Sequence, residues 1–282
     1  MKARAVAALG LFLVAGTLLR PAARAEPAPA AQPGCPPEML RVTSYCIDRW
    51  EASLVDAKSG LSLSPYYPPQ PVLLRRVLEL WRIERFQVGD SAARRMPLPE
   101  LGAHQLDKRF EPKAVSRAGV VPNGYMSYPM AKLACENAGK RLCSEKEWVL
   151  ACRGAQNSAF PYGDTFVKNK CNVFRLQHPA YVLHGSSSSG HTDPRLNLVF
   201  ENGEDPLLRL TGATPPCASR WGQDAAFDMV GNLDEWIDDE GGVFVGGFYA
   251  RATTKGCEAR IADHAATYYD YSIGTRCCKD RR

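Results

Sequence analysis

The sequence predicts a loop-rich α+β fold that is cross-linked by disulfides. The chain has ten cysteines, all between Cys35 and Cys278 and all after a predicted export signal. Thiols in an oxidising compartment form disulfides, and the count is even. The 282 residues include 23 Gly and 21 Pro, which favours loops over long helices. Two helix patterns stand among many short strand-like segments.

The N-terminus has the pattern of a secretory signal. A basic start precedes an apolar run over 5–19, and Ala23-Arg24-Ala25 is a small-x-small cleavage pattern. The run is shorter than the ~20 residues of a membrane-spanning helix, which disfavours a retained anchor. We therefore expect a removed signal peptide (1–25), a flexible Pro/Ala-rich tether (26–34) and a periplasmic or secreted chain without stable membrane insertion.

The charge distribution argues against nucleic acid as a partner. The net charge is only +5, and no segment forms a basic block. Nucleic-acid binding proteins concentrate their positive charge on one face or along one helix. We therefore expect no nucleic-acid partner.

The folded part opens with a predicted hairpin. Segments 40–42 and 45–47 have the character of short strands around a turn. A bridge between Cys35 and Cys46 would close this small hairpin. Farther along, residues 72–86 carry apolar side chains at roughly helical spacing.

Two main helices are predicted in the middle of the chain. Ser127 can cap a helix over 128–138, which Gly139 would end. Ser144 and Glu147 form a capping-box pattern for a second helix over 145–152. The remaining segments predict a surface insertion (94–121), a turn (160–164), a serine-rich loop (186–190), and short strands with tight turns (227–236, 243–249 and 273–277).

Six motifs occur in an order that resembles the formylglycine-generating enzyme family, also called sulfatase-modifying factors. The resemblance implies one loop-rich domain over 35–282, with a divergent N-terminal part (35–122). It also implies a fold related to C-type lectins and stabilised by calcium. The motifs are Ala134-Cys135-Glu136-Asn137-Ala138-Gly139-Lys140-Arg141-Leu142, then Glu145-Lys146-Glu147-Trp148 with Ala151-Cys152-Arg153-Gly154, then Pro161-Tyr162-Gly163-Asp164, Cys171-Asn172, Phe227-Asp228-Met229-Val230-Gly231-Asn232-Leu233-Asp234-Glu235-Trp236, and Gly246-Gly247 with Gly274-Thr275-Arg276-Cys277.

Calcium is the cofactor that the resemblance implies. Calcium takes several oxygen ligands, which carboxylates and the carbonyls of a turn can supply. The family's calcium positions match Asp228, Gly231, Leu233 and Glu235. A second family site would begin at Asn172 and the Val173 carbonyl. The alternative is a tight turn with solvated carboxylates.

The resemblance also implies disulfide pairs. The family bridges would join Cys135 to Cys277 and Cys152 to Cys257. The adjacent Cys277 and Cys278 are expected to serve different partners, because neighbouring side chains rarely bridge each other. Two further pairs are then possible, Cys143–Cys278 and Cys171–Cys217.

The copper centre of the family is expected to be absent. The family's enzymes use copper(I) to oxidise a cysteine of a sulfatase to formylglycine. Two reactive cysteines, which follow shortly after the Gly-Gly in the sequence, bind the copper. Here Phe248 stands at the serine position and Arg251 at the first cysteine position. Asp234 replaces an aromatic residue. Cys257, the only cysteine in the segment, matches the structural bridge.

The sequence contains no clear motif for binding another metal. A related branch binds iron through H-x-x-x-H-x-E, and no histidine here has that spacing. Three histidines of one loop could gather a metal, although surface histidines are the simpler interpretation. The five histidines are His104, His178, His184, His191 and His264.

Three functions are compatible with this pattern. The leading hypothesis is an exported, calcium-stabilised binding or accessory domain for a protein or glycan partner. The alternative is a divergent formylglycine-generating oxidase. The third is a structural envelope protein. Five closed disulfides would favour the first hypothesis over the second, because they leave no thiol for catalysis.

Overall fold

The computed structural model describes residues 34–84, 95–107 and 109–281. The predicted signal peptide (1–25) and all of the predicted tether except Gly34 lie outside the described residues. Within the described part, no helix has both the length and the apolar character that crossing a membrane requires.

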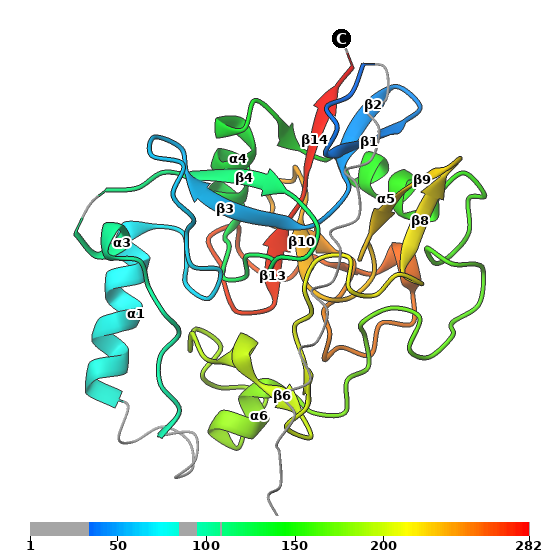
Figure 1. The fold of residues 1–282 in the computed structure, drawn as a ribbon. Coiled ribbons are helices and arrows are strands. Elements are labelled where there is room, and N and C mark those ends of the chain that lie inside the picture. Colours follow the sequence, from blue (N-terminus) through cyan, green and yellow to red (C-terminus); the bar gives the residue numbers. More distant parts are fainter. Residues whose placement is uncertain (1–33, 85–94, 108, 282) are drawn as a thin grey trace, which may run out of the picture.

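One four-stranded sheet joins the two ends of the described chain. The C-terminal strand β14 (Cys277–Asp280) lies between β2 (Tyr45–Asp48) and β5 (Arg141–Leu142), and β1 (Met39–Val42) pairs with β2. All three pairings are antiparallel. The predicted hairpin over 40–47 is therefore confirmed, and Figure 1 shows it beside the C-terminal strand.

A second four-stranded sheet carries the motifs of the C-terminal half. Its order is β12 (Arg260–Ile261), β11 (Phe244–Val245), β10 (Asp234–Trp236) and β13 (Ile273–Thr275). Strands β10 and β13 are parallel, and the other pairs are antiparallel. The segment before the Gly-Gly and the segment before Arg276 therefore contribute to one sheet.

The expectation of an irregular insertion over 94–121 was wrong. This segment contains the short helix α3 (Ala103–Asp107) and strand β4 (Pro112–Ser116). Strand β4 pairs with all five residues of β3 (Ala52–Asp56). Val115 is the one residue of β4 with a strong preference for strands, so the pairing with β3 rather than local propensity makes this segment a strand.

Among the residues that the structure describes, three helices have nine or more residues, where the sequence predicted two main helices and a further helical segment. They are α1 (Pro71–Glu84), α4 (Tyr128–Asn137) and α5 (Glu145–Arg153). The capping box of Ser144 and Glu147 at the start of α5 is confirmed. Ser127 does occupy the N-cap of α4, but its side chain makes no capping hydrogen bond there.

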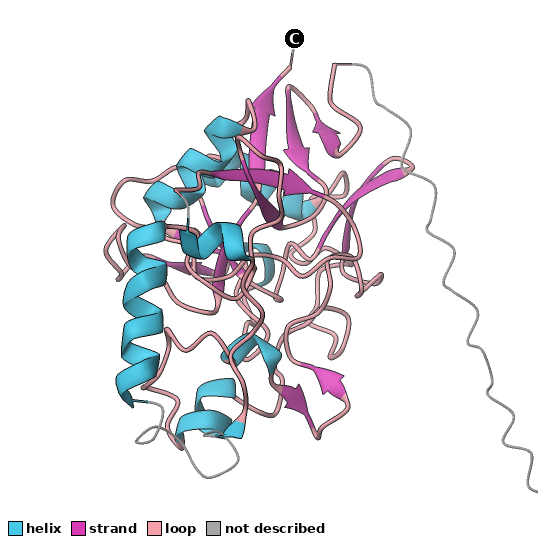
Figure 2. Ribbon diagram, turned by 60° about the vertical axis from the view of Figure 1, so that its left-hand side comes forward, coloured by secondary structure: helices cyan, strands magenta, loops and turns pink. Residues whose placement is uncertain are grey.

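Shorter elements complete the described chain (Figures 1 and 2). Two small hairpins and one short helix lie between α5 and β10. These elements are α6 (Pro179–His184), β6 (Phe200–Glu201), β7 (Asp205–Pro206), β8 (Ala218–Trp221) and β9 (Asp224–Phe227), with 3-10 turns at Leu196–Leu198 and Gly256–Glu258.

Five disulfides cross-link the fold, and no cysteine is free. The neighbours Cys277 and Cys278 bridge to different elements because successive strand residues point to opposite faces. The five pairs are the ones that the sequence suggested: Cys35–Cys46, Cys135–Cys277, Cys143–Cys278, Cys152–Cys257 and Cys171–Cys217.

The core consists of adjoining apolar clusters around large aromatic side chains. Trp148 and Trp236, each 1% exposed, lie in two different clusters. A third cluster contains Tyr125, Tyr249 and Tyr271. The segment 229–236 contributes residues to all three clusters, so it lies at the centre of the core.

Candidate functional site

The predicted calcium loop encloses a buried ion pair. Asp228 and Glu235 are 3% and 1% exposed, so the interpretation as solvated carboxylates was wrong. Both Glu235 oxygens accept hydrogen bonds from the Arg276 guanidinium, at 2.7–2.9 Å. Trp148 Nε1 donates to Glu235 Oε2 at 2.6 Å. The glutamate thereby joins helix α5 and the residue between strands β13 and β14 to the loop.

A third carboxylate, which the sequence motifs did not indicate, meets this loop. Glu51 Oε1 accepts from the Leu233 backbone N–H at 3.0 Å, and Oε2 accepts from Asn232 Nδ2 at 2.6 Å. Burial raises the pKa of Glu51 well above its usual value, and the charges of Asp228 and Glu235 raise it further. Glu51 precedes Asn232 by 181 residues, and no local pattern connects the two.

The predicted calcium ligands supply negative charge, and their carboxylates already accept hydrogen bonds within the protein. Three buried carboxylates, Glu51, Asp228 and Glu235, face the guanidinium of Arg276, and the charge of Arg209 also acts on Asp228. However, Glu235 is fully engaged, and Asp228 Oδ2 accepts from the Gly212 N–H at 2.7 Å. Among the described residues, no three His, Cys, Asp or Glu side chains are close enough to hold a metal. Calcium at these positions stays a prediction.

The second predicted site lies against the first. The Asn172 carbonyl accepts from the Asn232 N–H at 2.9 Å, and Asn172 Nδ2 donates to Asn232 Oδ1 at 2.9 Å. Asn172 Oδ1 is buried without a hydrogen-bond partner, so this acceptor is open to a cation. A side chain at Gly231 would clash with the Asn172 carbonyl and with Val173. The two predicted sites therefore share the Asn232 region.

An ion pair occupies the position that corresponds, by the resemblance, to the family's copper-binding cysteines. Arg251 Nη1 lies 2.8 Å and 2.7 Å from the two carboxylate oxygens of Asp234, which is 1% exposed. The Gly247 N–H also donates to Asp234 at 2.9 Å, and the guanidinium lies over the Phe248 ring at 5.0 Å. Burial raises the pKa of Asp234 to about 7, although Arg251 opposes this shift. This arrangement contains no soft ligand for copper(I).

The three loop histidines do not converge on one point. His178 Nε2 lies 3.1 Å from the Tyr271 hydroxyl, and His184 Nε2 lies 3.0 Å from Asp193 Oδ2. His191 Nε2 lies 2.8 Å from a backbone carbonyl of its own loop. Burial lowers the pKa of His178, and nearby His191 lowers it further. Each histidine therefore makes its own hydrogen bond, and all three are partly buried.

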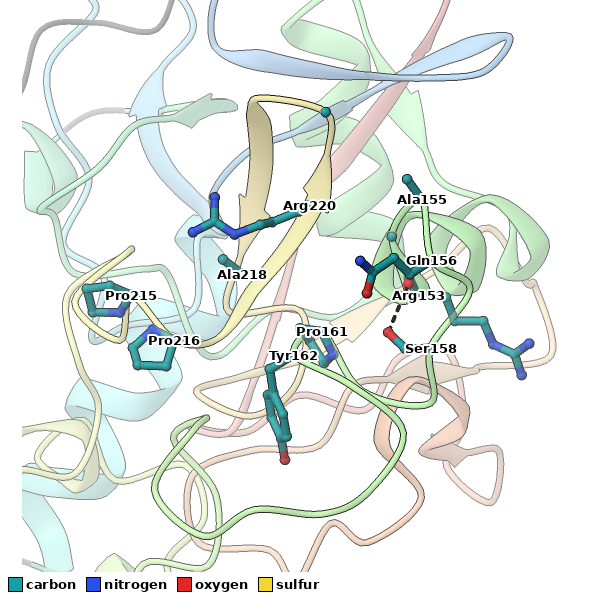
Figure 3. Close-up of a pocket in the computed structure, with 12 residues that line it drawn as sticks. Arg153, Ala155, Gln156, Ser158, Pro161, Tyr162, Pro215, Pro216, Ala218 and Arg220 are labelled. Carbon is teal, nitrogen blue, oxygen red and sulfur yellow. Dashed lines mark hydrogen bonds between the residues drawn. The ribbon is translucent and has the colours of Figure 1, made fainter.

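A hollow of about 470 Å³ lies between the end of α5 and strand β8 (Figure 3). Pro161, Tyr162 and the pair Pro215-Pro216 form apolar walls. Gln156 and Arg220 supply exposed hydrogen-bond donors. No Asp, Glu, His or Cys lines the hollow, which suits binding rather than acid–base or thiol chemistry.

The family of this chain is shown by a match to a known protein family over most of its length. The family described as "Sulfatase-modifying factor enzyme 1-like domain" matches residues 102–281. The chain belongs to this family, which agrees with the disulfide-rich mixed fold and with the order of the motifs.

Two curated relatives are formylglycine-generating enzymes. The mouse enzyme (Mus musculus) is 30% identical over 143 residues, which cover 50% of this chain and 33% of that protein. The bovine enzyme (Bos taurus) is 33% identical over 116 residues, which cover 41% of this chain and 26% of that protein. The matched region thus spans a third or less of each relative.

Two solved structures also match this chain at low identity. PvdO from Pseudomonas aeruginosa is 14% identical, with a TM-score of 0.38 over 84% of this chain and 80% of its own. CarF is 13% identical, with a TM-score of 0.39 over 84% of this chain and 87% of its own.

Proposed function

We propose that this protein is an exported, calcium-stabilised binding or accessory domain of the sulfatase-modifying factor family that lacks the copper oxidase centre. The observation that carries the proposal is the state of the cysteines, since all ten are in disulfides. Copper(I) oxidation needs two free thiolates close together. The disulfides also fit an oxidising compartment, so we place the chain in the periplasm or outside the cell.

The Asp234–Arg251 pair supports the absence of the oxidase centre. A copper site needs a vacant pocket with thiolates, whereas a carboxylate and a guanidinium fill this position. Phe248 covers the guanidinium, and it is itself 7% exposed. One substitution would therefore not create a copper site, because the ion pair and the aromatic ring would also have to move.

The hollow between α5 and β8 is the surface that we propose for the partner. Its proline and tyrosine walls offer apolar contact, while Gln156 and Arg220 can bind carbonyl, hydroxyl or carboxylate groups. Such a surface suits an extended peptide or a glycan outside the cytoplasm. Nucleic acid is not proposed, because the chain carries no basic block.

The second candidate is a divergent formylglycine-generating oxidase. The likeness to the mouse and bovine enzymes favours it. It requires a reduced cysteine pair in the functional protein, which would have to come from opening one of the five bridges.

An assay of a cysteine peptide separates the two functions. The mature, oxidised protein is supplied with copper(I), oxygen and an excess of the cysteine peptide, whose surplus thiols provide the two electrons that reduction of oxygen to water requires beyond those of the converted cysteine. Conversion of the peptide cysteine to formylglycine, with release of sulfide, is followed by mass spectrometry. We expect no conversion and no copper retained after dialysis. Copper-dependent conversion that a double serine variant of one bridge abolishes would establish the oxidase instead.

A further inference from the structure

One edge of the β8–β9 hairpin borders the hollow at the end of α5 (Figure 3). Strand β8 pairs with β9 in a two-stranded sheet, so only one of its edges is paired with another strand. Ala218 and Arg220 of β8 both line the hollow. At Arg220 the unpaired edge is partly used by the chain itself, because the Ala155 N–H donates to the Arg220 carbonyl at 2.9 Å. The edge at Ala218 lies beyond this contact.

The backbone of Ala218 has no hydrogen bond across the hairpin. Ala218 lies opposite Phe227, whose N–H donates to the Arg49 carbonyl at 2.8 Å and whose carbonyl accepts from Arg276 Nη2 at 2.9 Å. Within the described residues, no hydrogen bond involves the N–H or the carbonyl of Ala218. Because hydrogen-bonded and non-hydrogen-bonded pairs alternate along an antiparallel ladder, both groups point away from β9. Ala218 is 4% exposed, and backbone groups at this depth nearly always have a partner.

Arg220 gives the hollow a positive charge without a counter-charge. Its side chain is exposed, and no carboxylate in the described part of the chain forms an ion pair with it. The other arginine of the hollow, Arg153, is paired with Glu258. Arg220 follows Ala218 by two residues, so the two side chains lie on the same face of β8, about 7 Å apart along the strand. A chain that pairs with Ala218 would therefore have an unpaired guanidinium beside it.

We propose that the hollow binds an extended, acidic segment of another protein, which adds to the edge of β8. The main chain of this segment exchanges N–H···O bonds with Ala218, and one of its carboxylates binds Arg220. An apolar side chain of the segment contacts the wall of Pro215, Pro216 and Tyr162. A glycan could meet Arg220, but its hydroxyls do not reproduce the donor and acceptor spacing of a strand. This inference rests on the proposed binding function and names the chemistry of the partner.

Fluorescence anisotropy with two labelled octapeptides tests the charge preference. One peptide alternates valine and glutamate, and the other alternates valine and lysine. We expect the mature, oxidised protein to bind the glutamate peptide at least about tenfold more tightly than the lysine peptide, because a hydrogen bond to a charged group is worth more than a neutral one. The variant R220E should lose this preference and favour the lysine peptide.

Methylation of the peptide nitrogens tests the pairing with the strand edge. Alternate N–H groups of an added strand face β8, and the others face away from it. Two glutamate peptides are therefore compared, each N-methylated at one of the two alternating sets of positions. We expect one set to weaken binding by about tenfold or more and the other set to change it little. Equal effects of the two sets would contradict the addition of a strand.

A matched control reverses the charge of another exposed arginine. R75E changes helix α1, which Figures 1 and 2 show on the side of the molecule away from β8. This variant should bind the glutamate peptide as the wild type does, and thermal melting verifies that every variant is folded.

Two results would overturn the proposal. The first is no binding of the glutamate peptide, or equal binding by R220E and the wild type. The second is binding of a heparin hexasaccharide that R220E abolishes, without peptide binding, which would identify a glycan as the occupant. Neither result would affect the proposed accessory function, which fails only if the oxidised protein converts the cysteine peptide with copper.

Discussion

The buried pair of Glu235 and Arg276 should be a main determinant of stability. We consider the substitution Glu235→Gln, which keeps the shape of the side chain and removes its charge. Arg276 is 0% exposed and would remain buried as a cation. Its other hydrogen bonds go only to the carbonyls of Asp48, Arg49 and Phe227. The guanidinium would then make hydrogen bonds to neutral acceptors alone, and the charges of Asp228 and Glu51 would act on it without a direct hydrogen bond.

The magnitude follows from the burial of both partners. Breaking a buried ion pair by removing one partner costs 3–5 kcal/mol. We expect about 3 kcal/mol, at the lower end, because the amide oxygen and the three carbonyls still accept hydrogen bonds. For a chain of this size, that loss lowers Tm by about 6–12 °C.

Urea unfolding of the oxidised mature protein measures the loss, once with calcium and once with a chelator. The control is Glu258→Gln, which removes an exposed pair with Arg153 and should cost about 0–1 kcal/mol. If Glu235 also binds calcium, its substitution will cost more when calcium is present. A loss below about 1 kcal/mol in both conditions would refute the reasoning about the buried charge.

Three further predictions concern the ion pair and one disulfide. In chelator, the pKa of Asp234 is about 7 in the folded state, which is above its unfolded value, so the folded state binds more protons than the unfolded state between about pH 4 and 7. The wild type should therefore lose stability relative to D234N as the pH rises through this range. Thermal melts that show the reverse slope would contradict this prediction. R251A should cost about 1–3 kcal/mol in urea at pH 8 and little at pH 5, because it leaves a buried carboxylate unpaired only when Asp234 is ionised; an equal cost at both pH values would count against it. C171S/C217S removes a bridge between cysteines 46 residues apart and should lower the free energy of unfolding by about 4 kcal/mol according to the loop-entropy relation. An unchanged urea midpoint would show that the bridge contributes little to stability.

Local patterns in the sequence were sufficient for several parts of the fold. The hairpin of β1 and β2 and the capping box of α5 depend on neighbouring residues, so the sequence displays them directly. The alternation of side chains along a strand also explains why Cys277 and Cys278 separate. The motif over 227–236 identified the segment that lies at the centre of the core.

Long-range pairings were beyond the reach of such patterns. Strand β4 contains one strong strand former, Val115, and it is a strand because β3, about 60 residues earlier, pairs with it. Glu51 contacts Leu233 across 182 residues, and only the fold brings the two together. Glu235 was expected as a free ligand because the motif does not reveal its buried partner Arg276, which comes 41 residues later. Burial and counter-charge are properties of the folded molecule.

A thiol count on the mature protein tests the central claim most directly. The protein is denatured without reductant and alkylated, and its mass is compared with that of a reduced, alkylated sample. We expect no free thiol and five intact bridges, with no copper bound. Two free cysteines in the native, exported protein, accompanied by bound copper, would contradict it.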